Sequence, residues 1–304
     1  MNFYSTKVWL ELTIPLQWGH IAAKSLGNPQ DPPVLCIPGW THNLGIFEKL
    51  LPLLPEKKYF VFIDLLGRGF SSHLPEVCDY TRSLHVASFE KIRRYFNWDV
   101  FSLLGHCYGG ILAACYSSIF PERVDKLILL DPFNPKQRKL LVQSVQMKAI
   151  RRGIEKSITI GPVNNAALSG MTYETARSIF LKAHPYLSVD HADIILQRAI
   201  KKDEKDGSYS YTHDRRLVLG ATNALHEDIE AKLFSNIKAQ TLHIVYSKED
   251  FEGIVFENFG NCKHRENVIV NGNHLAHLCD PHAVAPHIIS FLQRPPSLSI
   301  KPRL

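Results

Sequence analysis

A cysteine in a tight, glycine-bounded turn is the residue of this chain best placed for nucleophilic chemistry. The sequence Gly105-His106-Cys107-Tyr108-Gly109-Gly110 follows an apolar run at residues 100–104 and precedes helix formers at residues 111–115. Strand, sharp turn and helix form the context of a nucleophile elbow, G-x-Nuc-x-G, in which the flanking glycines let the turn tighten. We therefore expect the Cys107 side chain to project from the end of a strand, beside a helix N-terminus, where a nucleophile attacks acyl groups.

A nucleophile in such a turn needs a base, and the base needs an acid that orients it. In this architecture the chain order is nucleophile, acid, histidine. Asp250 follows a predicted strand at residues 241–246, and Glu249 beside it is an alternative acid. His274 lies in a turn after a predicted strand at residues 267–270. The order predicts a triad of Cys107, Asp250 and His274.

The remaining catalytic groups are expected to come from the backbone. An oxyanion hole uses N–H groups, one of them from the residue after the nucleophile, which is Tyr108. The second is expected from Trp40, in the loop after a predicted strand at residues 34–37. A further cluster of imidazoles and a thiol follows His274, but its spacing matches no zinc motif and Pro281 interrupts it. We expect neither a metal nor a cofactor.

Strands that alternate with helices must position these residues. Each expected strand is apolar throughout, which is typical of a parallel sheet covered on both faces. The pattern predicts an N-terminal hairpin at residues 8–24, further strands at 34–37, 59–64, 100–104, 124–130, 241–246 and 267–270, and helices at 46–54, 84–96, 111–115 and 281–292. Between them a polar stretch without a convincing strand predicts a helical lid. The expected domain division is a core at 1–132, a lid at 133–235 and the rest of the core at 236–304.

Composition narrows the class of protein. The chain has 304 residues, 45% of them hydrophobic and 21% charged, and a net charge of +6. A cluster of Lys and Arg at residues 136–156 is typical of a solvated helix face, with an anionic substrate or membrane surface as the alternative reading. No signature of nucleic-acid binding and no apolar run long enough for stable membrane insertion is present. The sequence does not define an oligomeric state.

The sequence also gives expectations for cellular location. Six dispersed cysteines without a C-x-x-C pair, together with an N-terminus that lacks signal-peptide character, favour a reducing compartment. The terminal Pro302-Arg303-Leu304 is similar to the peroxisomal S-K-L address. We expect a cytoplasmic or peroxisomal protein.

The chain resembles a known family, the α/β-hydrolases, and within it the serine hydrolase-like (kraken-like) proteins. The match covers both core segments and fades in the lid. It is carried by residues 18–24, 33–36, Gly39-Trp40, 53–55, Asp64 with Gly67, Gly69, Ser71 and Ser72, the elbow, 120–122, 124–131 and Gly272-Asn273-His274. The resemblance implies an α/β-hydrolase fold, with a mostly parallel sheet and an inserted helical lid, and a hydrolytic activity. The implied triad again falls on Cys107, Asp250 and His274.

Two residues depart from the family pattern. The family has Ser where this chain has Cys107, and His where it has Pro38 before Gly39-Trp40. A thiolate paired with His274 is a competent nucleophile. The resulting hypothesis is a hydrolase that cleaves a small or medium apolar ester, lactone or thioester through a covalent acyl-enzyme. The alternatives are an acyltransferase, a catalytically weakened enzyme and a ligand-binding protein on the same scaffold.

Overall fold

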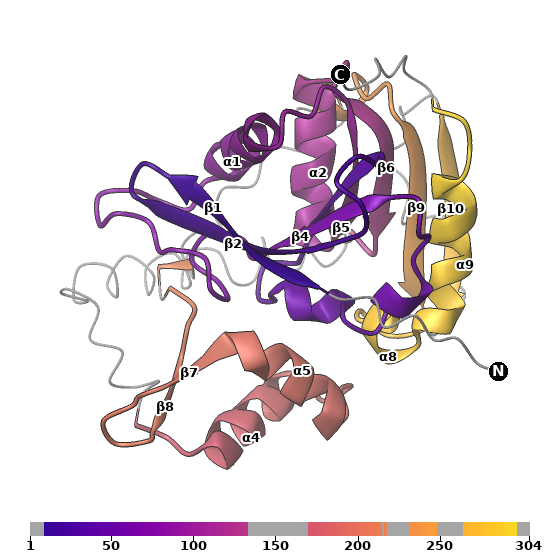
Figure 1. Ribbon diagram of the computed structural model, residues 1–304. Coiled ribbons are helices and arrows are strands. Elements are labelled where there is room, and N and C mark those ends of the chain that lie inside the picture. Colours follow the sequence, from indigo (N-terminus) through magenta and orange to yellow (C-terminus); the bar gives the residue numbers. More distant parts are fainter. Residues whose placement is uncertain (1–8, 133–169, 215, 218–231, 248–263, 297–304) are drawn as a thin grey trace.

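The fold is built on one twisted sheet. The computed structural model describes residues 9–132, 170–214, 216–217, 232–247 and 264–296. Eight strands follow the order β1-β2-β4-β3-β5-β6-β9-β10 (Figure 1). β2 runs antiparallel to β1 and β4, and the other neighbouring pairs are parallel. The strands are β1 (Leu10–Leu16), β2 (Gly19–Leu26), β3 (Pro33–Ile37), β4 (Tyr59–Ile63), β5 (Phe101–His106), β6 (Val124–Leu130), β9 (Gln240–Ser247) and β10 (Arg265–Asn271).

The central strands are apolar throughout because both faces of the sheet are covered. Side chains of a strand alternate between the two faces. In β3, Val34 and Cys36 join one core, while Leu35 and Ile37 join the other. The first core is completed by η1 (Leu44–Phe47), η2 (Leu51–Leu53), α8 (Ala276–Cys279) and α9 (Pro281–Leu292); the second is completed by α1 (Arg82–Tyr95) and α2 (Tyr108–Ile119). The expected parallel sheet with helices on both faces is present.

The parallel strands end at one edge of the sheet. Register pairs Ile37 with Gly105, and Gly105 with Leu129. Leu130 pairs with Ile244 in β9, which in turn pairs in register with β10. The segments that follow these strands therefore lie side by side, although they are far apart in the chain.

The insertion between β6 and β9 packs against this edge. Its described part holds α4 (Tyr173–Ala183), α5 (Val189–Ala199) and a short hairpin of β7 (Ile200–Lys202) with β8 (Tyr209–Tyr211) (Figure 1). Asn43 of the core donates its amide to the Ile195 carbonyl oxygen of α5 at 2.9 Å. The expectation of a strand-free insertion is wrong, because strands of three residues are too short to show alternation.

The prediction for residues 46–54 is also wrong. In place of one helix, the structure has the two 3₁₀ turns η1 and η2. Pro52 lacks the N–H that a continuous helix needs. The apolar spacing remains, and it buries Ile46 and Leu50 in the core.

The longer helices agree with their predicted positions. α1 begins after Thr81, whose hydroxyl accepts from Leu84 N at 3.2 Å, and α9 begins with Pro281 after the capping residue Asp280. None of the helices in the described ranges has the length and apolar character needed to cross a bilayer. Pro302-Arg303-Leu304 lies outside the described residues.

Candidate active site

Cys107 occupies a strained turn between β5 and α2. Its φ of +53° and ψ of −119° lie where few L-residues are found. The turn is held by the Cys107 N–H, which donates to the Leu130 carbonyl at 2.9 Å. A Cβ on Gly105 would lie 2.4 Å from the Gly109 carbonyl oxygen, and a Cβ on Gly109 would lie 2.4 Å from that of Ile37. Both positions therefore require glycine, as the elbow pattern indicates.

His274 is placed beside the sulfur by the turn after β10. The Asn273 side chain accepts from the Leu275 N–H at 2.8 Å, and His106 Nε2 donates to the His274 carbonyl oxygen at 2.8 Å. The His274 imidazole is hydrogen-bonded to the Cys107 side chain. The structure thus brings together two of the three residues proposed from the sequence.

The carboxylate that meets His274 belongs to Asp131, which follows β6. Its Oδ2 lies 2.5 Å from His274 Nδ1, and its Oδ1 accepts from the Tyr246 N–H at 3.3 Å. Both oxygens are therefore held. Asp250 and its alternative Glu249 lie outside the described residues, so their proposed role stays a prediction.

Backbone strain coincides with this constellation. Of the non-glycine residues in the described ranges, three have positive φ: Asn97, Cys107 and Asp131, the last at +41°. Strained backbone persists where the surrounding structure fixes it and is concentrated at functional sites. Asp131 N donates to the Ile244 carbonyl at 2.7 Å, which anchors the strained residue to β9. Two of these three positions thus carry the proposed nucleophile and the carboxylate that meets the base.

The electrostatics favour a charged imidazole at His274. Burial lowers its pKa, but the hydrogen bonds and charges of Asp131 and Cys107 outweigh burial and raise the pKa to about 10. His274 is therefore an imidazolium at neutral pH.

Buried neutral imidazoles line the inner side of the site. The His106 ring lies 4.6 Å from that of His274 and 4.5 Å from that of His277, measured between centroids. Burial lowers the pKa of His42, His106 and His277, and neighbouring imidazoles lower it further. Within the described ranges no three His, Cys, Asp or Glu side chains are grouped so as to hold a metal ion.

Trp40 and Tyr108 lie together next to the sulfur. A Cβ on the neighbouring Gly39 would be 3.2 Å from Cys107 Cβ, so the loop after β3 contacts the nucleophile. The Trp40 and Tyr108 rings meet edge to face with centroids 4.7 Å apart. The first N–H groups of a helix have no intrahelical acceptor, which suits Tyr108 N–H to an anion. Pro38 is buried in this loop.

The insertion adds two residues that the sequence argument missed. The His184 ring, at the end of α4, lies 5.3 Å from that of His42. Burial raises the pKa of Tyr186 to about 12, with smaller contributions from Cys107 and Cys279. Both residues belong to the insertion between β6 and β9 and lie near the site. The sequence held no signal for them, whereas Asp131 had one, since an acidic residue closes the predicted strand at residues 124–130.

The chain is similar in sequence to known proteins. A family model described as the alpha/beta hydrolase fold matches residues 32–149. A serine hydrolase-like protein of Danio rerio is 33% identical, covering 93% of this chain and 88% of its own length. Serine hydrolase-like protein 2 of Homo sapiens is 30% identical, covering 93% and 94%.

Solved structures show the same fold. A hypothetical protein of Pseudomonas aeruginosa PAO1 superposes with a TM-score of 0.76 at 23% identity, covering 93% of this chain and 99% of its own. A thioesterase domain of the curacin biosynthetic pathway has a TM-score of 0.75 at 21% identity, with the same coverages. The fold expected from the sequence is confirmed.

Proposed function

Because this chain belongs to the α/β-hydrolase family, we propose that it is a hydrolase with a Cys107–His274–Asp131 triad. The observation that carries the proposal is the continuous chain of hydrogen bonds from the Cys107 side chain through the His274 imidazole to the Asp131 carboxylate. Asp131 is the acid of this proposal; Asp250, which the sequence predicts for that role, lies outside the described residues. The proposed substrate is a small or medium apolar ester, lactone or thioester, and no cofactor takes part.

The first half of the reaction transfers the acyl group to sulfur. The Cys107 thiolate attacks the carbonyl carbon, and the N–H groups of Trp40 and Tyr108 hold the oxyanion. When the tetrahedral intermediate collapses, the His274 imidazolium gives its proton to the leaving alcohol or thiol. A thioester on Cys107 and a neutral His274 remain.

The second half returns the enzyme to its starting state. Neutral His274 takes a proton from water, whose oxygen attacks the thioester carbonyl. Collapse of this second intermediate expels the Cys107 thiolate and releases the carboxylic acid. Asp131 keeps the Nδ1–H of His274 in place throughout, so that Nε2 faces the sulfur.

The lid supports an apolar acyl group in this site. His184 and Tyr186 reach the edge of the sheet from α4 and the segment after it. Tyr186 presents an aromatic ring that remains 36% exposed. Apolar and aromatic lining with few polar groups is typical of small-molecule sites.

The direct test is formation of the acyl-enzyme. Wild-type protein is mixed with p-nitrophenyl butyrate or a butyryl thioester, quenched early, and examined by intact mass and peptide mapping. The expected result is a butyryl group on Cys107, steady release of butyrate, and a loss of at least about 10³-fold in Cys107→Ala and His274→Ala.

Cys78→Ala is the matched control, because Cys78 is a free, partly buried thiol on a loop far along the chain from the elbow. It should retain wild-type turnover. Tight binding of the ester without any product or adduct would contradict the proposal and favour the ligand-binding alternative. An adduct released to an added alcohol in preference to water would favour the acyltransferase.

A further inference from the structure

Arg68 is a buried arginine that meets no carboxylate among the residues that the structure describes. Its side chain is 3% exposed, and it donates Nη1 to the Leu66 carbonyl at 3.0 Å and Nε to the Trp40 carbonyl. Its Nη2 has no hydrogen-bond partner in the described part of the chain. Burial lowers the pKa of Arg68 to about 10, and the nearby phenols and Asp214 oppose this only in part. Burying the Arg68 guanidinium costs free energy, and no ion pair within the described ranges offsets that cost.

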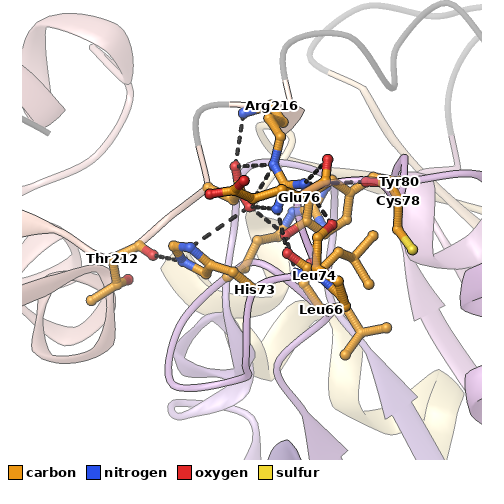
Figure 2. A network of polar contacts seen from close by, with 11 residues as sticks. Leu66, His73, Leu74, Glu76, Cys78, Tyr80, Thr212 and Arg216 are labelled. Carbon is orange, nitrogen blue, oxygen red and sulfur yellow. Dashed lines mark hydrogen bonds and ion pairs between the residues drawn. The ribbon is translucent and has the colours of Figure 1, made fainter. Parts of the chain in front are cut away.

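Other arginines of the same region are paired conventionally. Arg216 meets Asp214 at 2.7 Å while it also donates to the Leu74 carbonyl, in the network drawn in Figure 2. Arg198 pairs with Asp64 at 2.9 Å. These arginines join the lid region to the core. Arg68 differs because its acceptors are backbone carbonyls of two loops at the edge of the sheet.

The turn that carries Arg68 is rigid. Gly67 and Gly69 have φ of +76° and +54°, and a Cβ on Gly69 would lie 2.2 Å from the Asp64 carboxylate. That carboxylate accepts from the N–H groups of Leu44 and Phe70, both at 2.9 Å. The backbone on both sides of Arg68 is therefore fixed, and the guanidinium is preorganised where it lies.

Arg68 contacts Trp40, which supplies one proposed oxyanion donor. Trp40 in turn contacts Tyr108, which supplies the other. The guanidinium carbon lies 4.3 Å from the Trp40 ring centroid, over its face. The same indole also meets the Tyr108 ring, at 4.7 Å and nearly perpendicular. Contacts from the guanidinium to the indole and from the indole to the phenol thus link the two residues whose N–H groups would hold the oxyanion.

We infer that Arg68 is a positioning residue for the oxyanion hole. It holds the Trp40 backbone through the carbonyl and the Trp40 side chain through the cation–π contact, which fixes the Trp40 N–H relative to that of Tyr108. The inference rests on the proposed function, since it assigns a role within that same site.

The test separates acyl transfer from simple reactivity of the sulfur. Acylation by an ester passes through an oxyanion, whereas alkylation by iodoacetamide does not. In Arg68→Met, we expect single-turnover acylation by p-nitrophenyl butyrate to fall about 10- to 100-fold. Alkylation of Cys107 should stay within about twofold of wild type, because that reaction forms no oxyanion.

Arg93→Met is the matched control. Arg93 also donates to a tryptophan carbonyl, that of Trp98 at 2.5 Å. Unlike Arg68, it is paired with a carboxylate, that of Glu90 at 2.9 Å, and both residues lie on α1. Its loss should lower the melting temperature by about 2–4 °C and leave acylation within about twofold of wild type. The two variants would then differ in the step that they affect, since only Arg68→Met slows acylation.

A second variant covers the case in which Arg68→Met does not fold. Arg68→Lys keeps a cation near the indole but cannot hold the Trp40 and Leu66 carbonyls together, so acylation should again fall while alkylation persists. Acylation of a folded Arg68 variant at the wild-type rate, or a parallel fall of acylation and alkylation, would overturn the inference alone. A wild-type protein that takes up no acyl group would overturn the proposed function as well.

Discussion

Replacing Asp131 by Asn tests which carboxylate serves His274. The substitution keeps the size of the side chain and removes its charge. At about 1.4 kcal/mol per pH unit, the rise of the His274 pKa from 6.5 to about 10 corresponds to roughly 5 kcal/mol, supplied by Asp131 and Cys107 together. The imidazole side chain is 32% exposed, so screening and division between two partners leave Asp131 with roughly 2 kcal/mol. That energy corresponds to about 30-fold in rate.

Hydrogen bonding increases the expected loss. The two carboxylate oxygens of Asp131 serve Tyr246 N and His274 Nδ1, and an amide has one oxygen for these two donors. If the amide oxygen stays at Tyr246, the NH₂ group faces His274 and selects the tautomer with its proton on Nε2. In a Ser-His-Asp enzyme the same exchange costs about 10⁴-fold. We therefore expect kcat/KM of Asp131→Asn to fall at least about 30-fold.

The assay follows hydrolysis of an ethyl ester from pH 5 to 10. A poor leaving group makes protonation by His274 necessary, so the high-pH limb reports loss of the imidazolium. This limb should lie near pH 10 in wild type and move toward neutrality in Asp131→Asn. Asp250→Asn is measured in parallel. Full activity in Asp131→Asn together with a collapse in Asp250→Asn would refute the assignment and restore the acid expected from the sequence.

Three further predictions concern the elbow and its charge. First, the raised pKa of His274 means that its contribution to stability is complete below pH 6.5 and is lost as pH rises toward about 10; urea unfolding at pH 6 and pH 9 should show wild type losing roughly 2 kcal/mol more than His274→Ala. Second, Cys107→Ser replaces the thiolate by a hydroxyl, so thioester hydrolysis should fall at least tenfold; a large rise would instead identify Cys107 as a substitution that weakens catalysis. Third, Gly109→Ala places a methyl group 2.4 Å from the Ile37 carbonyl oxygen, so its melting temperature should fall by several degrees and its activity should be lost.

The elbow was predictable because its constraints are local. Gly105 and Gly109 meet backbone atoms of their own turn and of β3, and no other residue fits these spaces. The apolar strands were also predictable, because burial on both faces leaves a continuous pattern in β3 to β6. His274 followed from its position after the last strand of this pattern.

The acid was less accessible to sequence reasoning. Chain order allows both Asp131 and Asp250, because each lies between Cys107 and His274. The carboxylate on His274 Nδ1 is that of Asp131, and Asp250 lies outside the described residues. In the sheet β6 lies between β5 and β9, so a residue after β6 reaches the site as readily as one after β9. Strand order in space is a long-range property, and the pattern of a single sequence does not record it.

Tertiary packing also determined the remaining unexpected residues. Arg68 lies in a motif that the family resemblance includes, yet its contact with Trp40 depends on two loops separated by β4. His184 reaches His42 because α5 packs on η1 and α4 packs on α5. Helical periodicity predicts such helices but not the face of the core on which they pack.

The most direct measurement is the pH dependence of Cys107 alkylation by iodoacetamide, followed by peptide mass spectrometry between pH 5 and 9. A thiolate held by the His274 imidazolium should react selectively at Cys107 below pH 7, and His274→Ala should abolish that reaction. A Cys107 that stays unmodified below pH 7 in folded protein, or that reacts equally without His274, would contradict the account.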